Sequence, residues 1–463
     1  MNIRKIFLFL IINLFIVNIA YASIDIPTEI RIGLYYGSKG ASSITLSAPA
    51  GIEIGTFDGE DFDVIEELDA NDKITVKRGN KKGSVTVSGI GEFGDSNNVP
   101  YFRSLENRND ERIIVVNDKK YRGDIEIKRY SDSDMTVINV VGMQEYLYGV
   151  VPREIGGNSP YEAVKAQAIV ARTYAIKNYE KRMKWGFNLY PTVDDQAYGG
   201  YEWENVNSNR AVDETDGQVV TYEGKLIDGY YFSTSGGYTE NSENVWTSAL
   251  GYLKAVPDPY EPDNLSKTTW TVELTADEVE ERLAKNGVYV GNIINIEPTE
   301  YTEAGRVLEL KIEGTEGTKI ITKSKARTYL GLDSQWYTIN DEPPKALEVI
   351  VDRENRDDKE DVKKDEEDKK DEKNENEKVE EERELKPLLK QLTSLIRGEK
   401  SDVNVIKQEY TARKSYTDIF VIQGRGWGHA VGMSQNGAKG MAENGFTAEE
   451  IIKWYYTGVE VTD

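Results

Sequence analysis

The sequence contains no cysteine and a single histidine, His429, among its 463 residues. Without cysteine the chain forms no disulfides, thiolate metal sites or iron–sulfur clusters, and it has no cysteine nucleophile. A single histidine leaves almost no material for a zinc site built on several histidines or for a conventional histidine-based triad. We therefore expect a protein that uses no metal and no cofactor.

Basic residues are scarce relative to acidic ones, with 57 Lys and Arg against 81 Asp and Glu and a formal net charge of -24. Nucleic acid is excluded as an expected partner, because affinity for phosphate backbones requires basic surface. The length corresponds to two or three domains. The 28 tyrosines suit either sugar-stacking surfaces or β-sheet.

The amino terminus has the layout of a secretory signal, which we place at residues 1–22. Arg4 and Lys5 precede an apolar run, Ile6–Ile19, and an A-x-A site, Ala20-Tyr21-Ala22, follows it. The alternative is an uncleaved membrane anchor, but the run is shorter than the roughly 20 residues that a spanning helix needs. We expect cleavage after Ala22 and an exported chain, secreted or in the cell wall, with membrane contact only if the segment stays uncleaved.

Residues 343–414 form a charged, low-complexity insert. Its centre, residues 352–385, has 18 acidic and 10 basic residues and no apolar periodicity. Such a stretch buries too little surface to offset the entropy of ordering, so we predict disorder or a frayed, solvated helix.

The remainder predicts an α+β fold: a mixed, β-rich architecture with one long central helix and a few shorter helices. We assign residues 23–130 to an N-terminal β-rich part, residues 131–342 to a core, and residues 415–463 to a C-terminal segment that completes the core. Alternating apolar and polar residues predict the strands. They are Arg31–Tyr36, Ser43–Ser47, Ile74–Lys77, Ser84–Ser88, Asp124–Lys128, Met135–Val141, Gln218–Tyr222, Leu226–Phe232, Val307–Ile312 and Asp418–Gln423.

Capping-box patterns predict three helix starts, at Ser159–Glu162, Thr275–Glu278 and Thr447–Glu450. The first helix has Pro160 at its first position and continues to about Met183. The other two end at Asn286-Gly287 and Gly458. A fourth, short helix opens at Ser434-Gln435 and ends at Asn444-Gly445.

The long helix is apolar nearly all the way round, which indicates a central position. Lys165 and Arg172 interrupt this pattern two turns apart on nearly one face. Either both reach the surface or an acidic partner, or they line a cleft that begins just before the helix.

Glu154 lies just before that helix, between a hydrophobic stretch and the turn Gly156-Gly157. An apolar setting disfavours the charged carboxylate and raises its pKa, which prepares a general acid for a glycosidic oxygen. A glutamate next to a turn is also common on an ordinary surface, so the spacing alone leaves both interpretations open.

Five segments, in order along the chain, resemble the SpoIID/LytB family, whose type member is stage II sporulation protein D. The segments are YLYGVVPREIGGNSPYEAVKAQAIVARTYAIKN (146–178), DDQAYGGYE (194–202), YYFSTSGGYTENSENVW (230–246), YLGLDSQWYTI (329–339) and GRGWGHAVGMSQNGAKGMAENG (424–445). The resemblance implies a protein that acts on the glycan strands of peptidoglycan. It is either a lytic transglycosylase that cleaves between N-acetylmuramic acid and N-acetylglucosamine, or an enhancer of an N-acetylmuramoyl-L-alanine amidase. A structural wall protein is a third interpretation.

The resemblance also implies residue roles. Glu154 occupies the place of the family's catalytic acid. Substrate contact, or support of Glu154, is implied for Lys165, Gln167, Arg172, Tyr174, Tyr198, Tyr231 and His429. His429 lies in a glycine-rich loop and either orients that loop or touches substrate. Asp195, Glu240 and Glu243 are further cleft candidates by resemblance.

The sequence departs from the family pattern after Glu154, where Ile155 and Gly156 replace the usual methionine and proline. Glycine is expected to loosen the turn that aims Glu154. Some family members bind zinc near the GG-x-T segment, but the matching residues 232–237 contain no cysteine or histidine, so no zinc site is carried over.

Overall fold

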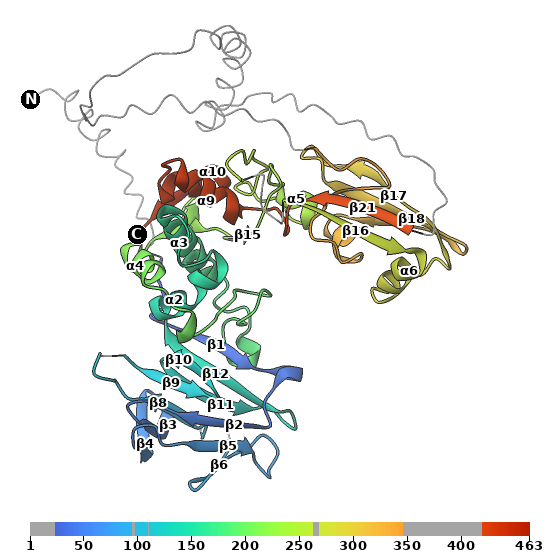
Figure 1. Ribbon diagram of the computed structural model, residues 1–463. Coiled ribbons are helices and arrows are strands. Elements are labelled where there is room, and N and C mark those ends of the chain that lie inside the picture. Colours follow the sequence, from blue (N-terminus) through green and yellow to red (C-terminus); the bar gives the residue numbers. More distant parts are fainter. Residues whose placement is uncertain (1–23, 95–97, 110, 263–267, 346–418) are drawn as a thin grey trace, which may run out of the picture.

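The computed structural model of the chain describes residues 24–94, 98–109, 111–262, 268–345 and 419–463 (Figure 1). It has the predicted α+β fold. The predicted signal, residues 1–22, and nearly all of the predicted insert lie outside the described residues. Within the described ranges, no helix has the length and apolar character needed to cross a bilayer.

The N-terminal part consists of two six-stranded sheets. The first has the order β1 (Glu29–Tyr35), β12 (Met135–Gly142), β11 (Asp124–Arg129), β8 (Tyr101–Ser104), β3 (Ile52–Asp58) and β4 (Asp61–Leu68). The second has the order β10 (Lys119–Arg122), β9 (Ile113–Val116), β2 (Ser43–Ser47), β5 (Ile74–Arg78), β6 (Val85–Val87) and β7 (Gly91–Phe93). Alternate residues of β2 and β5 are buried in the core cluster that both sheets share, as the period of two predicts.

The helices around α3 (Tyr161–Lys177) form a central layer between these sheets and a second β-rich lobe (Figure 1). Helix α3 contacts α2 (Met143–Glu154), α4 (Val206–Glu214), α9 (Gln435–Glu443), α10 (Ala448–Tyr455) and β13 (Val219–Tyr222). Its side chains are buried from Ala163 to Ile176 except at Lys165. The predicted central position of this helix is confirmed, because the many alanines let neighbouring elements approach from several sides.

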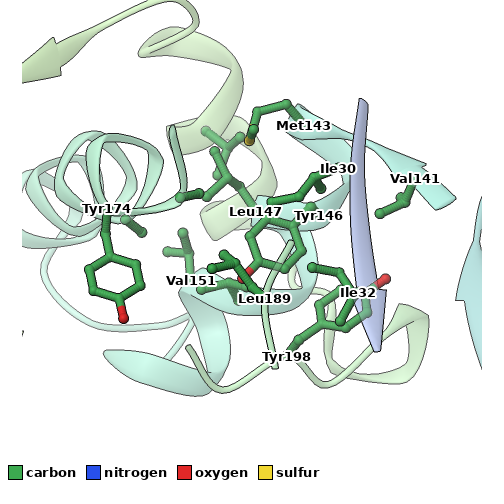
Figure 2. Close-up of a cluster of buried hydrophobic side chains, with 14 of the residues drawn as sticks. Ile30, Ile32, Val141, Met143, Tyr146, Leu147, Val151, Tyr174, Leu189 and Tyr198 are labelled. Carbon is green, nitrogen blue, oxygen red and sulfur yellow. The ribbon is translucent and has the colours of Figure 1, made fainter. Parts of the chain in front are cut away.

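Helix α2 directly follows β12 and was not predicted, because Gly149 and Pro152 lie inside it. Both residues disfavour a helix interior. Tertiary packing outweighs that preference here. The inner side of α2 joins the core against β1 (Figure 2), in a cluster that includes Tyr146, Leu147, Val151, Ile30 and Ile32.

The predicted start of α3 at a capping box is wrong. The N-cap is Pro160, without a side-chain cap, and Ser159 Oγ donates to the Ile155 carbonyl at 2.7 Å. Glu162 Oε2 accepts from the Ala448 N–H at 2.8 Å, so this carboxylate serves the start of α10 instead. The helix also ends at Lys177 rather than near Met183, because the side-chain amide of Asn178 donates a hydrogen bond to the Tyr174 carbonyl at 2.9 Å.

The capping boxes at Thr275 and Thr447 are confirmed at the starts of α6 (Ala276–Ala284) and α10. Helix α10 ends at Tyr455, three residues before the predicted stop. Helix α9 begins after Ser434, whose hydroxyl accepts from the Gly437 N–H, as predicted.

The predicted strand Leu226–Phe232 is wrong, because two short strands replace it. β14 (Lys225–Leu226) pairs with β13, whereas β15 (Tyr231–Phe232) pairs in parallel with β22 (Met433–Ser434). This second pairing joins residues about 200 positions apart and brings Tyr231 close to the start of α9.

The second β-rich lobe has its own hydrophobic cluster. It contains β16 (Thr269–Thr275), β21 (Ile419–Arg425) and β20 (Trp336–Ile339) in one sheet, and β17 (Ile293–Tyr301), β18 (Val307–Gly314) and β19 (Gly317–Thr322) in another. Helices α6 and α7 (Ser324–Thr328) pack against these strands. The short helix α5 (Ser242–Val245) lies between β15 and β16 in the sequence, and strand β23 (Glu460–Thr462) pairs with β13.

The strands on either side of the acidic insert are antiparallel neighbours. Ile339 of β20 pairs with Ile422 of β21, and Asn340 and Val421 exchange two further hydrogen bonds of 2.8 and 2.9 Å. The described residues on either side of the insert are thus paired directly with each other.

We predict that replacing residues 352–385 by a short Gly/Ser linker leaves the melting temperature and any glycan cleavage close to wild type. Closure entropy changes by only about 0.6 kcal/mol for each halving of loop length. Calorimetry of the two proteins tests this. A loss of stability of several kcal/mol upon replacement would show that the run is an ordered element of the fold.

Candidate active site

Glu154 is the last residue of α2 and lies where segments from distant parts of the chain converge. Its Oε1 accepts a hydrogen bond from the Ala197 N–H at 2.6 Å. The carboxyl group also forms hydrogen bonds with the side chains of Tyr231, from β15, and Gln435, from α9. Packing of α2 on β1 determines where the helix ends, and therefore where this side chain is placed.

The pKa of Glu154 is raised above its ordinary value. Burial is the main cause, and the hydrogen bonds from Ala197, Tyr231 and Gln435, together with the positive charge of Arg153, oppose it only in part. The position at the C-terminal, negative end of α2 disfavours the anion further. No ion pair neutralises this carboxylate among the residues that the structure describes. The group is thus prepared to carry a proton.

Uncharged side chains form a second layer around Glu154. Gln196 Nε2 donates to the Tyr231 hydroxyl at 3.2 Å and to the Ala171 carbonyl at 3.2 Å, while its Oε1 accepts from Tyr146 at 3.1 Å. Gln435 Nε2 donates to Gln167 Oε1 at 3.2 Å. These amides and hydroxyls orient the carboxyl group without supplying a positive charge that would lower its pKa.

Asp195 organises the loop that provides Ala197. Its carboxylate is 2.6 Å from Lys181 Nζ and 3.1 Å from Arg182 Nε, and it accepts from the Tyr190 N–H at 2.8 Å. Burial raises its pKa, but the hydrogen bonds from Arg182 and Lys181 outweigh this effect and hold the pKa below the ordinary value. Asp195 is therefore an ionised structural group and not a second proton donor.

Part of this geometry lies in a segment that matches a known family. Residues 131–222, which include Glu154, Gln196 and Ala197, match the family model described as Stage II sporulation protein (SpoIID). Over these residues the chain is similar to that family. The resemblance to the SpoIID/LytB family is confirmed. Residues 253–351 match a second model, described as Domain of unknown function (DUF8618).

Curated relatives have similar sequences. The chain is 29% identical to the amidase enhancer of Bacillus subtilis (strain 168) over 338 residues, which cover 68% of this chain and 40% of that protein. It is 26% identical to stage II sporulation protein D of the same strain over 354 residues, 73% of this chain and 79% of the relative. An uncharacterized protein of Brachyspira hyodysenteriae (strain ATCC 49526 / WA1) is 29% identical over 351 residues, 76% of this chain and 74% of the relative. The chain thus spans less than half the length of the amidase enhancer.

Two of the residues implied by resemblance, Gln167 and Tyr231, lie in the hydrogen-bond network of Glu154. Gln167 is fully buried, and its Nε2 has no partner among the described residues. Burial and the nearby carboxyl of Glu154 hold the pKa of Tyr231 well above its ordinary value, so its hydroxyl stays protonated and donates to Glu154.

Lys165, Arg172 and Tyr198 have partners elsewhere in the segment that matches the SpoIID family. Arg172 is buried and donates to the carbonyls of Gln218 and Val212, both at 3.1 Å. Lys165 lies 3.5 and 3.6 Å from the carboxylates of Glu162 and Glu214, respectively. Tyr198 is buried and donates to Asn139 Oδ1 at 2.8 Å. These contacts hold the helices and β12 together.

Tyr174 and His429 both pack against Tyr230, and neither is a hydrogen-bond partner of Glu154 among the described residues. Tyr174 accepts a hydrogen bond from Lys181 Nζ at 3.0 Å. His429 Nδ1 accepts from the Val431 N–H at 3.1 Å, and the ring packs among Tyr230, Phe232 and Trp246. Burial lowers the pKa of His429 to about 4, so the imidazole is neutral at neutral pH. These contacts suit the orientation of the glycine-rich loop.

The remaining acidic candidates also have structural partners. Glu240 is fully buried and accepts from Asn244 Nδ2 at 2.8 Å and from Thr302 Oγ1 at 2.5 Å. Glu243 forms an ion pair with Lys254 at 2.9 Å.

The turn after Glu154 is held by specific contacts. Gly156 has φ +90, a conformation that proline, with φ near −65°, does not adopt. The Ser159 N–H donates to the Gly156 carbonyl at 3.1 Å, in addition to the bond from its hydroxyl to Ile155. The replacement of proline by glycine therefore accompanies a different turn, closed by Ser159.

Sequence reasoning missed the contributions of Ala197, Gln196, Gln435 and Tyr146 to the site. All four residues lie inside the segments that resemble the family, so the resemblance could have marked them as candidate site residues. A backbone N–H has no residue signature, however, and the roles of the two glutamines depend on pairings between distant segments.

Proposed function

We propose that the chain is a peptidoglycan lytic transglycosylase, with Glu154 as the general acid and base. The observation that carries the proposal is a glutamate with a raised pKa, held by one backbone N–H and two neutral side chains, inside the segment that matches the SpoIID family. The similarity to an amidase enhancer and to stage II sporulation protein D supports a role connected with the cell wall.

In this mechanism protonated Glu154 gives its proton to the oxygen that links N-acetylmuramic acid to N-acetylglucosamine. The bond from C1 of the muramyl residue to that oxygen breaks, and positive charge develops on the ring. The Glu154 carboxylate then accepts the proton of the same residue's 6-hydroxyl group. The freed O6 bonds to C1 and forms a 1,6-anhydro ring, and Glu154 is protonated again for the next cycle.

A single carboxyl group suffices for this chemistry, whereas glycosidases that hydrolyse with water use two. In the described hydrogen-bond shell of Glu154 the partners are Ala197, Tyr231 and Gln435, and none is a carboxylate. Asp195, two residues before Ala197, is paired with Lys181 and Arg182. The site thus fits an internal hydroxyl nucleophile better than an activated water.

The second candidate function is a glycan-binding enhancer of a cell-wall amidase that itself cleaves nothing. The observation that favours it is the similarity to a relative named amidase enhancer. Under this function the same surface binds glycan strands and an amidase is the partner.

The test incubates the purified chain with intact and with peptide-free glycan strands, followed by mass spectrometry for 1,6-anhydro products. Transglycosylase action is expected to produce anhydro-disaccharides. If neither substrate yields anhydro ends, while added chain accelerates a purified N-acetylmuramoyl-L-alanine amidase, the second function replaces the first.

Because the substrate lies outside the cytoplasm, we further propose that residues 1–22 export the chain. Mass spectrometry of protein recovered from the culture medium and wall fraction is expected to find a mature N-terminus at Ser23. Recovery of the full-length chain from the membrane fraction would favour the anchor.

The pH dependence of cleavage follows from the raised pKa of Glu154. The acid form is needed for the first step, so kcat/KM is expected to fall as the pH rises through that pKa. The midpoint of this fall should lie above the value of about 4.3 for an unperturbed glutamate. Initial rates measured across a pH series test this, and a midpoint at or below the unperturbed value would contradict the assignment.

A further inference from the structure

An exposed tryptophan, Trp203, lies against Arg153, the residue before Glu154. Trp203 ends the short 3-10 helix Tyr201–Trp203, six residues after Ala197, and half of its surface, 50%, is open to solvent. The segment that carries it follows α2, because the Gly199 N–H donates to the Gly149 carbonyl at 2.9 Å. The indole is thus placed along the same helix that ends at Glu154.

Arg153 and Gly199 both contact the indole and hold it in place. The guanidinium of Arg153 lies 4.0 Å from the centre of the ring, and Arg153 immediately precedes Glu154. A side chain at Gly199 would meet the ring at 2.5 Å, so the ring packs directly on that glycine. The indole is therefore held as a fixed aromatic surface near the end of α2.

Amide side chains cluster at the turn after Glu154, close to Trp203 along the chain. Asn158, four residues after Glu154, accepts from Asn205 Nδ2 at 3.0 Å and from Asn207 Nδ2 at 3.3 Å. Asn205 packs on Gly157 in the turn that follows the acid. Between the two asparagines, Val206 is 80% exposed. Carboxamides have two donors and an acceptor oxygen each, so they retain hydrogen-bonding capacity toward a ligand.

We infer that these residues form a saccharide-binding subsite next to Glu154, here called the Trp203 face and defined by Arg153, Asn158, Trp203, Asn205, Val206 and Asn207. The C–H face of an amino sugar packs on the exposed indole, and the carboxamides bond to its hydroxyl and acetamido groups. Arg153 is a positioning residue that holds the indole. The inference rests on the proposed function in that the sugar belongs to the same glycan.

Size and chemistry favour a sugar over a protein partner. The exposed apolar part consists of one indole and one valine side chain, whereas a stable protein interface buries about 800 Å² on each partner. An aromatic face beside a few polar groups is the usual composition of a small-molecule site. The amides are uncharged and match a ligand that is rich in hydroxyl and amide groups.

The test measures binding without cleavage, in a chain that carries Glu154→Gln. Isothermal titration with a chitin tetramer and with peptide-free glycan strands compares this parent with the additional change Trp203→Ala. We expect at least about tenfold weaker binding, which corresponds to 1.4 kcal/mol. Trp203→Phe, which keeps an aromatic ring, should recover most of the affinity.

Two further variants make the outcome decisive. Val206→Asp places a charge on the Trp203 face at the first position of α4, where an acidic residue suits the helix dipole. It should fold normally and still weaken binding. Tyr289→Ala removes an aromatic side chain that is 70% exposed in the second lobe, and it should leave binding unchanged.

The inference is overturned if folded Val206→Asp and Trp203→Ala proteins bind both ligands as the parent does. Its failure differs from failure of the proposed function. If cleavage depends on Glu154 but is unchanged in Trp203→Ala, the subsite is rejected and the transglycosylase assignment stands. If binding depends on Trp203 but the protein forms no anhydro ends, the subsite is supported and the transglycosylase assignment is rejected.

Discussion

Replacing Glu154 by glutamine is expected to lower the rate of glycan cleavage by about 10²–10⁴-fold, the usual contribution of general acid–base catalysis. Glutamine has nearly the same shape, and its Oε1 can still accept from the Ala197 N–H. The change also removes a carboxyl group whose ionised form is disfavoured by burial. We therefore expect an unchanged or slightly higher melting temperature. Mass spectrometry of anhydro products and calorimetry measure the two effects.

Two control variants separate the role of Glu154 from a general effect of charge or packing. Glu180→Gln changes an exposed glutamate and should keep full activity. Tyr231→Phe removes a hydrogen bond that lowers the pKa of Glu154, so the alkaline limb of the pH profile should move to higher pH. Full activity in Glu154→Gln would show that another group is the acid.

Replacing Arg306 by methionine is expected to destabilise the chain by about 3–5 kcal/mol, the cost of removing one partner of a buried charge pair. Arg306 is 0% exposed. Its guanidinium lies 3.9 Å from Glu240 and donates to the carbonyls of Ser235, Tyr238 and Thr239 at 2.8, 2.6 and 3.1 Å. The three carbonyls lose these hydrogen bonds in the variant, and Glu240 loses its ion-pair partner while it keeps the bonds from Asn244 and Thr302.

This prediction is checked by denaturant unfolding, with Arg210→Met as the matched control. Arg210 is largely exposed and lies 3.6 Å from Glu214, so its loss should change the stability far less than the loss of Arg306. Arg306 joins the second lobe to residues 235–240, which follow Tyr231 along the chain. Equal stability of the two variants would mean that this connection does not hold the fold together.

Local patterns in the sequence were sufficient wherever the deciding interactions are local. The strand Ser43–Ser47 and the capping boxes of Thr275 and Thr447 depend on a period of two or on contacts within three residues, and the structure has them. The apolar character of α3 on all sides predicted its burial in the same way. The apolar surroundings of Glu154 indicated the direction of its pKa shift, and the family motifs identified it as the candidate acid.

Only the tertiary structure decided which groups surround that acid. Helix α2 exists despite Gly149 and Pro152 because its inner side packs on β1, and Glu162 serves a helix start 286 residues away. The parallel pairing of β15 with β22 brings Tyr231 and Gln435 to one carboxyl group, together with the backbone of Ala197. Such partners depend on contacts between distant segments, which neither residue type nor spacing encodes locally.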